Sequence, residues 1–75
     1  MTHFQRIKDM RNDFDKSQQN IADYLKMNVT VYRRYENGER EVPAWVMVEL
    51  ANYYNVTLDF LAGRTNRYQK FYKEI

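Results

Sequence analysis

Apolar residues recur three and four positions apart along most of the chain, which is the spacing of one face of an α-helix. The first example comprises Phe4, Ile7, Met10 and Phe14, and it predicts a helix over residues 2–14. The pattern never alternates in the manner of a half-buried strand. The chain is therefore predicted to fold as an all-α protein.

Two short helices are predicted next, and each begins at a good capping residue. Ser17 precedes residues 18–25, and Asn28 precedes residues 29–37, so their side chains can accept hydrogen bonds from the first helical turns. Gly38 ends the second of these helices, because glycine adopts the left-handed conformation without strain. The inner faces are formed by Ile21, Ala22, Leu25, Tyr32 and Tyr35.

A fourth helix is predicted to start at Pro43, which suits a first turn, and to run to about Tyr54. Thr57 is the expected cap of a short fifth helix over residues 58–62, which Gly63 stops. The predicted core stripe of the fourth helix is Ala44, Met47, Val48 and Ala51, broadened by Leu50 and Tyr54.

The last twelve residues differ in character from the rest of the chain. Residues 1–63 form the predicted domain, and residues 64–75 form a basic aromatic tail that contains four Lys or Arg and one Glu. The apolar side chains of this tail again have helical spacing, which predicts an additional C-terminal helix. They are Tyr68, Phe71, Tyr72 and Ile75.

The composition argues against several classes of function. There is no Cys, and the single His3 lies near the N-terminus, so thiolate metal sites and a cysteine or histidine catalyst lack their residues. We expect no enzymatic activity, no metal and no cofactor. The longest apolar run, residues 44–48, is far too short to cross a membrane, and the N-terminus lacks the apolar run of a signal peptide. We therefore expect a cytoplasmic protein that does not contact a membrane.

Residues 17–38 carry the most specific signal in the sequence. Two helices of about eight residues are joined by only three residues, which forces them to cross steeply, with the small Ala22 where they touch. Together with Gln18, with the run from Arg34 to Gly38 and with residues 50–63, this segment resembles the lambda-repressor-like helix-turn-helix family, which includes Cro-type and xenobiotic-response-element-type regulators. The resemblance covers about residues 4–63 and implies a compact five-helix DNA-binding domain.

The resemblance implies that the helix over residues 29–37 enters the major groove of double-stranded DNA. The side chains expected to face outward from it are Val29, Thr30, Val31, Arg33 and Arg34. The alternative is an ordinary solvated face, against which the two valines argue. Gln18 matches the family's phosphate-contacting position at a helix N-terminus. Further candidates for contact with DNA are Lys16, Asn28, Asn37, Gly38 and Arg40.

Two other positions bear on the architecture. Arg11 and Glu36 match family positions that form a structural ion pair between the first helix and the recognition helix. Lys26 occupies the turn position where the family usually has Gly, which costs about 1 kcal/mol if the backbone there has a positive φ.

Trp45 shares a polar helix face with Glu49 and Asn52, which indicates either contact with a partner surface or partial burial against a loop of the same chain. The apolar stripe of the tail is predicted to pack on Trp45 of its own or a partner subunit and so to contribute to a homodimer interface. The competing hypothesis is a disordered basic tail that trails along phosphates. The predicted function is therefore a sequence-specific transcriptional regulator, a repressor of bacterial or phage type, which binds a two-fold operator as a homodimer. The alternative is an antitoxin-like or anti-repressor module whose main partner is a regulatory protein.

Overall fold

The computed structural model describes residues 4–65 of the chain, which form five α-helices and no β-strand. The observed helices are α1 (Gln5–Asp13), α2 (Gln18–Leu25), α3 (Val29–Asn37), α4 (Ala44–Tyr54) and α5 (Leu58–Leu61). The predicted bounds of α2 and α3 are confirmed. α1 begins three residues later than predicted, at Gln5, and α5 ends one residue earlier, at Leu61.

Side-chain caps fix the starts of three helices, as the sequence predicts. The Ser17 hydroxyl accepts from the Asn20 backbone N–H, and the Asn20 side chain accepts from the Ser17 backbone N–H, which completes a capping box at α2. Asn28 caps α3 by accepting from the Thr30 N–H at 2.7 Å, and Thr57 caps α5 in the same way. These local hydrogen bonds satisfy amides that have no partner inside a helix.

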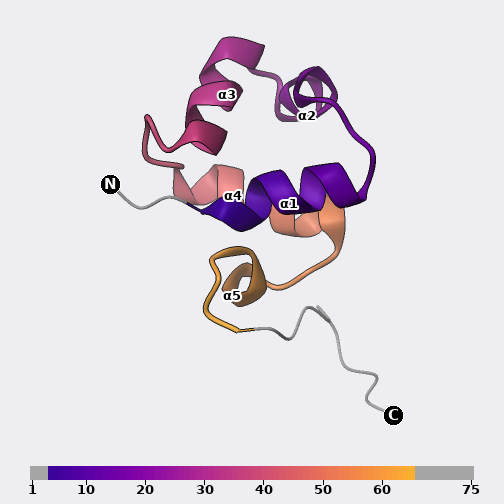
Figure 1. Cartoon of the computed structure of the whole chain (residues 1–75), viewed down its shortest axis with the longest axis vertical. Helices are drawn as coiled ribbons and strands as arrows, with labels where there is room; N and C mark the ends of the chain where they lie inside the picture. The colour runs from indigo at the N-terminus through magenta and orange to yellow at the C-terminus, as the bar shows by residue number, and fades with distance from the viewer. Residues whose placement is uncertain (1–3, 66–75) are drawn as a thin grey trace.

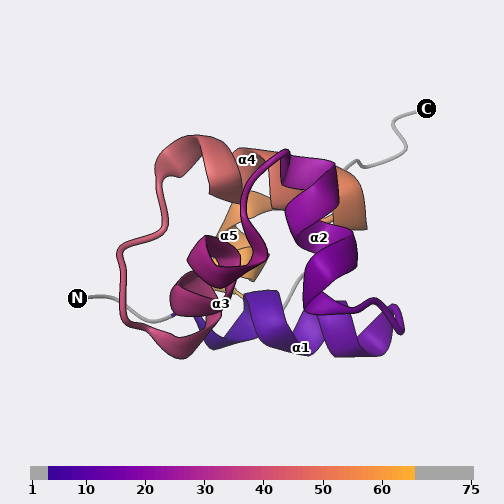
Figure 2. The same ribbon diagram turned by 90° about the horizontal axis from the view of Figure 1, so that it is seen from above.

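The helices form three tiers, which Figure 1 shows from the side. α2 and α3 form the upper tier, α1 and α4 lie at one level beneath them but at opposite edges of the domain in Figure 2, and α5 lies on the other side of this level. α2 is seen end-on in Figure 1 and from the side in Figure 2, whereas α3 is end-on in Figure 2, so the two helices cross steeply. The α2–α3 pair is therefore presented on one end of the domain.

The core lies between these tiers and draws on all five helices. Its fully buried members include Ile7, Ile21, Tyr32, Leu50 and Leu61. α3 also contributes a buried carboxylate, that of Glu36, which is 2% exposed.

The predicted core stripe of α4 needs a correction. Val46, Met47, Leu50, Ala51 and Tyr54 are buried, whereas the predicted core residues Ala44 and Val48 are exposed. Five consecutive apolar residues open this helix, so the local pattern does not determine which side faces inward. The buried residues of α4 are four positions apart, as in Val46, Leu50 and Tyr54, because residues at this spacing lie on one face of a helix and that face packs against the core.

Three helices end in a residue with a left-handed backbone. Lys26, at the end of α2, has φ 59°, and Asn55, at the end of α4, has φ 58°. Gly38, at the end of α3, has φ 79°. The predicted strain at Lys26 is thus present, because a side chain with a Cβ is disfavoured in this conformation by about 1 kcal/mol.

Candidate nucleic-acid interface

The α2–α3 pair has the geometry of a helix-turn-helix. Ala22 is fully buried, and its small side chain allows α2 and α3 to approach closely. Ile21 and Leu25 from α2 and Tyr32 and Tyr35 from α3 fill the space beneath the crossing. The turn of three residues, 26–28, holds α3 rigidly against α2 and leaves the opposite side of α3 uncovered.

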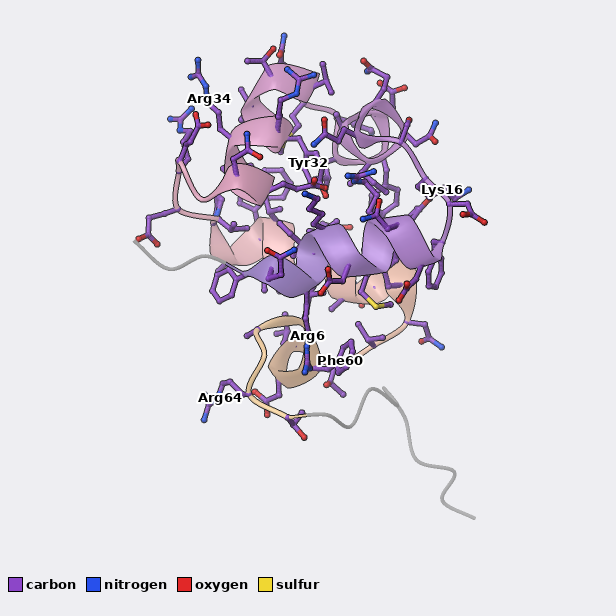
Figure 3. All side chains as sticks on the ribbon, viewed as in Figure 1. Arg6, Lys16, Tyr32, Arg34, Phe60 and Arg64 are labelled. Atoms are coloured by element: carbon purple, nitrogen blue, oxygen red, sulfur yellow. The ribbon has the colours of Figure 1, made fainter. Side chains whose placement is uncertain are left out.

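The uncovered side of α3 consists mainly of polar and basic residues. Thr30, Arg33 and Arg34 are exposed. Figure 3 shows Arg34 pointing away from the body of the domain. These side chains can donate and accept hydrogen bonds without any rearrangement of the core.

The two valines of α3 do not face outward as predicted. Val29 and Val31 are half-buried and pack against the core. Val29 and Val31 are the first and third residues of α3, so both stand in its first turn. Their β-branched side chains are therefore accounted for by packing, and the argument that they would otherwise be solvated is wrong.

A network of polar side chains connects the core to the outer side of α3. The Arg11 guanidinium donates to both carboxylate oxygens of Glu36, with Nε–Oε2 2.7 Å and Nη2–Oε1 3.1 Å. Gln18 Nε2 donates to Glu36 Oε1 at 3.0 Å, and Gln18 Oε1 accepts from Arg33 Nε at 3.2 Å. The network therefore passes from α1 through α3 and α2 and returns to α3 at Arg33.

Glu36 is the centre of this network and is held as a carboxylate. Its side chain is 1% exposed and that of Arg11 is 12% exposed. Burial by itself would raise the pKa of Glu36, but hydrogen bonds from Arg11 and Gln18 outweigh burial and hold the pKa below its ordinary value. The pKa of Arg11 is raised, first because of its hydrogen bond to Glu36. The predicted ion pair is thus present, and it also orients Gln18.

The other candidate residues lie around the α2–α3 pair. Lys16 precedes α2, and Figure 3 shows it on the opposite flank from Arg34. Asn37 and Arg40 are exposed at the end of α3 and in the loop that follows, and Gly38 between them is half-buried. The Asn28 side-chain oxygen is occupied by its cap on α3, which leaves its exposed amide group for a ligand.

Trp45 and the tail were predicted to form a partner contact. Trp45 is 53% exposed on the first turn of α4, next to Tyr24, which is 40% exposed and donates to Glu49 at 3.1 Å. The tail residues Tyr68, Phe71, Tyr72 and Ile75 lie outside the described residues. Their contact with Trp45 therefore stays a prediction.

The sequence analysis missed two features because both depend on contacts between distant residues. One is the position of Gln18 between Glu36 and Arg33. The other is Arg6, whose Nη1 donates to the carbonyls of Phe60 at 2.9 Å and Thr65 at 2.6 Å. No local spacing signals either contact, because the Arg6 partners are more than fifty residues away.

A steeply crossed helix pair within five short helices defines a helix-turn-helix domain. Residues 7–61 match the family described as Helix-turn-helix. The chain belongs to this family, in its lambda-repressor-like branch. The predicted fold class is therefore confirmed.

Two curated proteins are similar to this chain. It is 30% identical over 60 residues to the cryptic phage CTXphi transcriptional repressor RstR of Vibrio cholerae, and the aligned segment covers 80% of this chain and 54% of that protein. It is 34% identical over 62 residues to the SPbeta prophage-derived uncharacterized HTH-type transcriptional regulator YonR of Bacillus subtilis, and the aligned segment covers 83% of this chain and 57% of that protein. The chain thus spans little more than half the length of these relatives. No solved structure matches it. No helix within residues 4–65 is long and apolar enough to cross a membrane.

Proposed function

We propose that this chain is a sequence-specific DNA-binding transcriptional regulator, and specifically a repressor, that reads its operator with α3. The observation that carries the proposal is the exposed side of α3 on a helix-turn-helix unit, with Arg33 held by Gln18 and with Arg34 extended into solvent. The similarity to a phage repressor and a prophage regulator supports the same function.

In this proposal the N-terminal half of α3 lies in the major groove and the start of α2 faces the sugar–phosphate backbone. Arg34 is free to fork onto guanine, and the Thr30 hydroxyl and methyl can meet a base edge. Gln18 opens α2, where exposed backbone N–H groups and the helix dipole attract phosphate. Lys16, Asn28, Asn37, Gly38 and Arg40 are proposed to position the domain through backbone contacts.

We further propose that two copies bind a two-fold operator. A single recognition helix buries little DNA surface, and a second copy supplies the area that tight specific binding requires. The exposed Trp45, with Tyr24 beside it, is proposed as part of the contact between copies, because large exposed apolar side chains mark interaction surfaces.

The test begins with selection of bound sequences from a random duplex pool, followed by titration of the selected site. Arg34→Ala is expected to weaken binding by about 1–3 kcal/mol and to relax preference at one base pair. Arg64→Ala is the matched control. Arg64 is also exposed and basic, but Figure 3 shows it beside α5, on the opposite side of the domain from Arg34. Equal affinities of the two variants, or a selected site without two-fold symmetry, would contradict the corresponding part of the proposal.

If the protein binds no DNA even at low salt, the regulatory-protein partner of the alternative hypothesis becomes the better explanation. Such a result is distinguishable from misfolding, because the far-ultraviolet circular dichroism of the same sample reports its helix content.

A further inference from the structure

An apolar groove of about 520 Å³ is lined by residues of the described chain outside α2 and α3. Its walls come from the end of α1, the end of α4 and α5. The apolar and aromatic side chains that line it are Met10, Phe14, Tyr53, Tyr54, Val56 and Phe60. A groove of this size can accommodate several apolar side chains.

The groove wall combines buried and exposed residues. Tyr54 and Val56 are 3% exposed, whereas Phe14, on the apolar face from which the first helix is predicted, is 44% exposed. The centroid of the Phe14 ring lies 5.0 Å from that of Tyr54 in an edge-to-face arrangement, and the centroids of the Tyr54 and Tyr53 rings lie 5.1 Å apart in the same arrangement. Such an aromatic surface in water favours an occupant, because covering it removes apolar area from solvent.

Arg6 brings the end of the described chain to the edge of this groove. Its Nη1 donates both to the Phe60 carbonyl and to the Thr65 carbonyl, so Thr65 is held close to a residue that lines the groove. The Arg6 guanidinium also lies over the Phe60 ring, 4.3 Å from its centroid. The described part of the chain therefore ends close to a residue that lines the groove.

The apolar spacing of residues 66–75 suits an apolar groove. The apolar residues of this segment stand at i, i+3, i+4 and i+7, the spacing by which an amphipathic helix anchors in an apolar groove. A helix of these ten residues would be about 15 Å long, and the groove is lined along α1 by Met10, Asp13 and Phe14. Arg67, Lys70 and Lys73 fall outside the apolar positions of the segment, and the exposed Asp13 is an acidic member of the groove wall.

We propose that residues 66–75 dock as an amphipathic helix into the α1–α4–α5 groove of their own chain. Tyr68, Phe71, Tyr72 and Ile75 fill the groove, and Arg67 and the two lysines lie outside it, where Asp13 of the wall is available as an acidic partner. Docking at this site leaves the α2–α3 surface open, because no residue of α2 or α3 lines the groove. The tail then contacts neither phosphate nor Trp45, which lines a different pocket, so this proposal replaces the packing on Trp45 that the sequence predicts.

The chain has no Cys, so a single introduced cysteine can carry a spin label without side reactions. The label is placed on the full chain by Gln69→Cys, a position outside the apolar and charged positions of the tail. We expect the backbone amide signals of Met10, Asp13, Phe14 and Val56 to lose most of their NMR intensity, and those of α3 to keep theirs. Full intensity at the groove residues would overturn the proposal.

Two further measurements separate the remaining outcomes. Adding Phe71→Ser and Tyr72→Ser to the labelled chain should restore the groove signals, and adding Asn66→Ser, outside the apolar positions, should leave them broadened. An isotope-labelled wild-type chain mixed with the spin-labelled chain should show no broadening. Broadening in that mixture would mean that the tail docks on a second copy and would overturn docking within one chain.

Discussion

Removing the Glu36 carboxylate is expected to destabilise the domain more than any change at an exposed acidic residue. Glu36→Ala leaves the Arg11 guanidinium, 12% exposed, without its carboxylate partner. It also removes the acceptor of Gln18 Nε2. The Arg11 donor to the Lys16 carbonyl at 2.9 Å remains, so the charge keeps one hydrogen bond.

The expected loss follows from these contacts. Breaking a buried ion pair by removing one partner costs about 3–5 kcal/mol, and the remaining Lys16 contact places this case near the lower end, at about 3 kcal/mol. Glu36→Gln keeps the shape of the side chain and an acceptor, so it should lose only about 1–2 kcal/mol as charge-assisted hydrogen bonds become neutral. A domain of this length has a total stability of about 4–11 kcal/mol, so the glutamine variant should remain folded.

Urea unfolding followed by far-ultraviolet circular dichroism measures these differences. At about 1 kcal/mol per molar urea, the glutamine variant should shift the midpoint by about 1–2 M. Glu41→Ala is the control, because Glu41 is exposed and its loss should change stability by less than about 0.5 kcal/mol. If Glu36→Gln and Glu41→Ala have the same midpoint, the ion pair does not contribute as we argue.

Three further predictions concern other parts of the molecule. Lys26→Gly should stabilise the domain by up to about 1 kcal/mol in the same urea assay, because the backbone there is left-handed, whereas Lys8→Gly inside α1 should destabilise it by about as much. The pKa of Glu36 is lowered by folding, so the stability that its carboxylate contributes is complete above the ordinary pKa of 4.5 and is lost as the pH falls through the lowered pKa. The difference in urea midpoint between wild type and Glu36→Gln should therefore shrink at acid pH, and a constant difference would contradict this. Binding to the selected operator, measured by fluorescence anisotropy, should weaken by about three to five decades between roughly 50 and 200 mM salt if some 6–10 phosphates are contacted, and a flat response would contradict phosphate contact.

The parts of the fold that follow from the sequence are those fixed by local signals. Ser17, Asn28 and Thr57 start helices because each side chain bonds an amide two or three residues away. Gly38 ends α3 because the left-handed conformation is required at that single position. Such contacts depend only on neighbouring residues, so they can be predicted without knowledge of the tertiary packing.

The parts that could not be predicted depend on which surfaces meet. Val46 is buried and Val48 is exposed, although both are valines next to the buried Met47 in sequence. Val29 and Val31 are partly covered because they pack against the core cluster. The Arg11–Glu36 pair was predicted only through family resemblance, since nothing in a separation of 25 residues indicates that two side chains meet.

The connection from Glu36 through Gln18 to Arg33 makes the residues of α3 unequal in how freely they can change. Thr30 and Arg34 are exposed, so a new preference for bases could arise there without disturbing the core. Gln18 donates to the Glu36 carboxylate, which also holds Arg11 of α1, and accepts from Arg33, so a substitution at Gln18 or Arg33 disturbs a network that contributes to stability as well as to recognition. Divergence of operator preference among proteins with this network should therefore begin at Thr30 and Arg34, and changes at Gln18 should follow only where the fold has stability to spare.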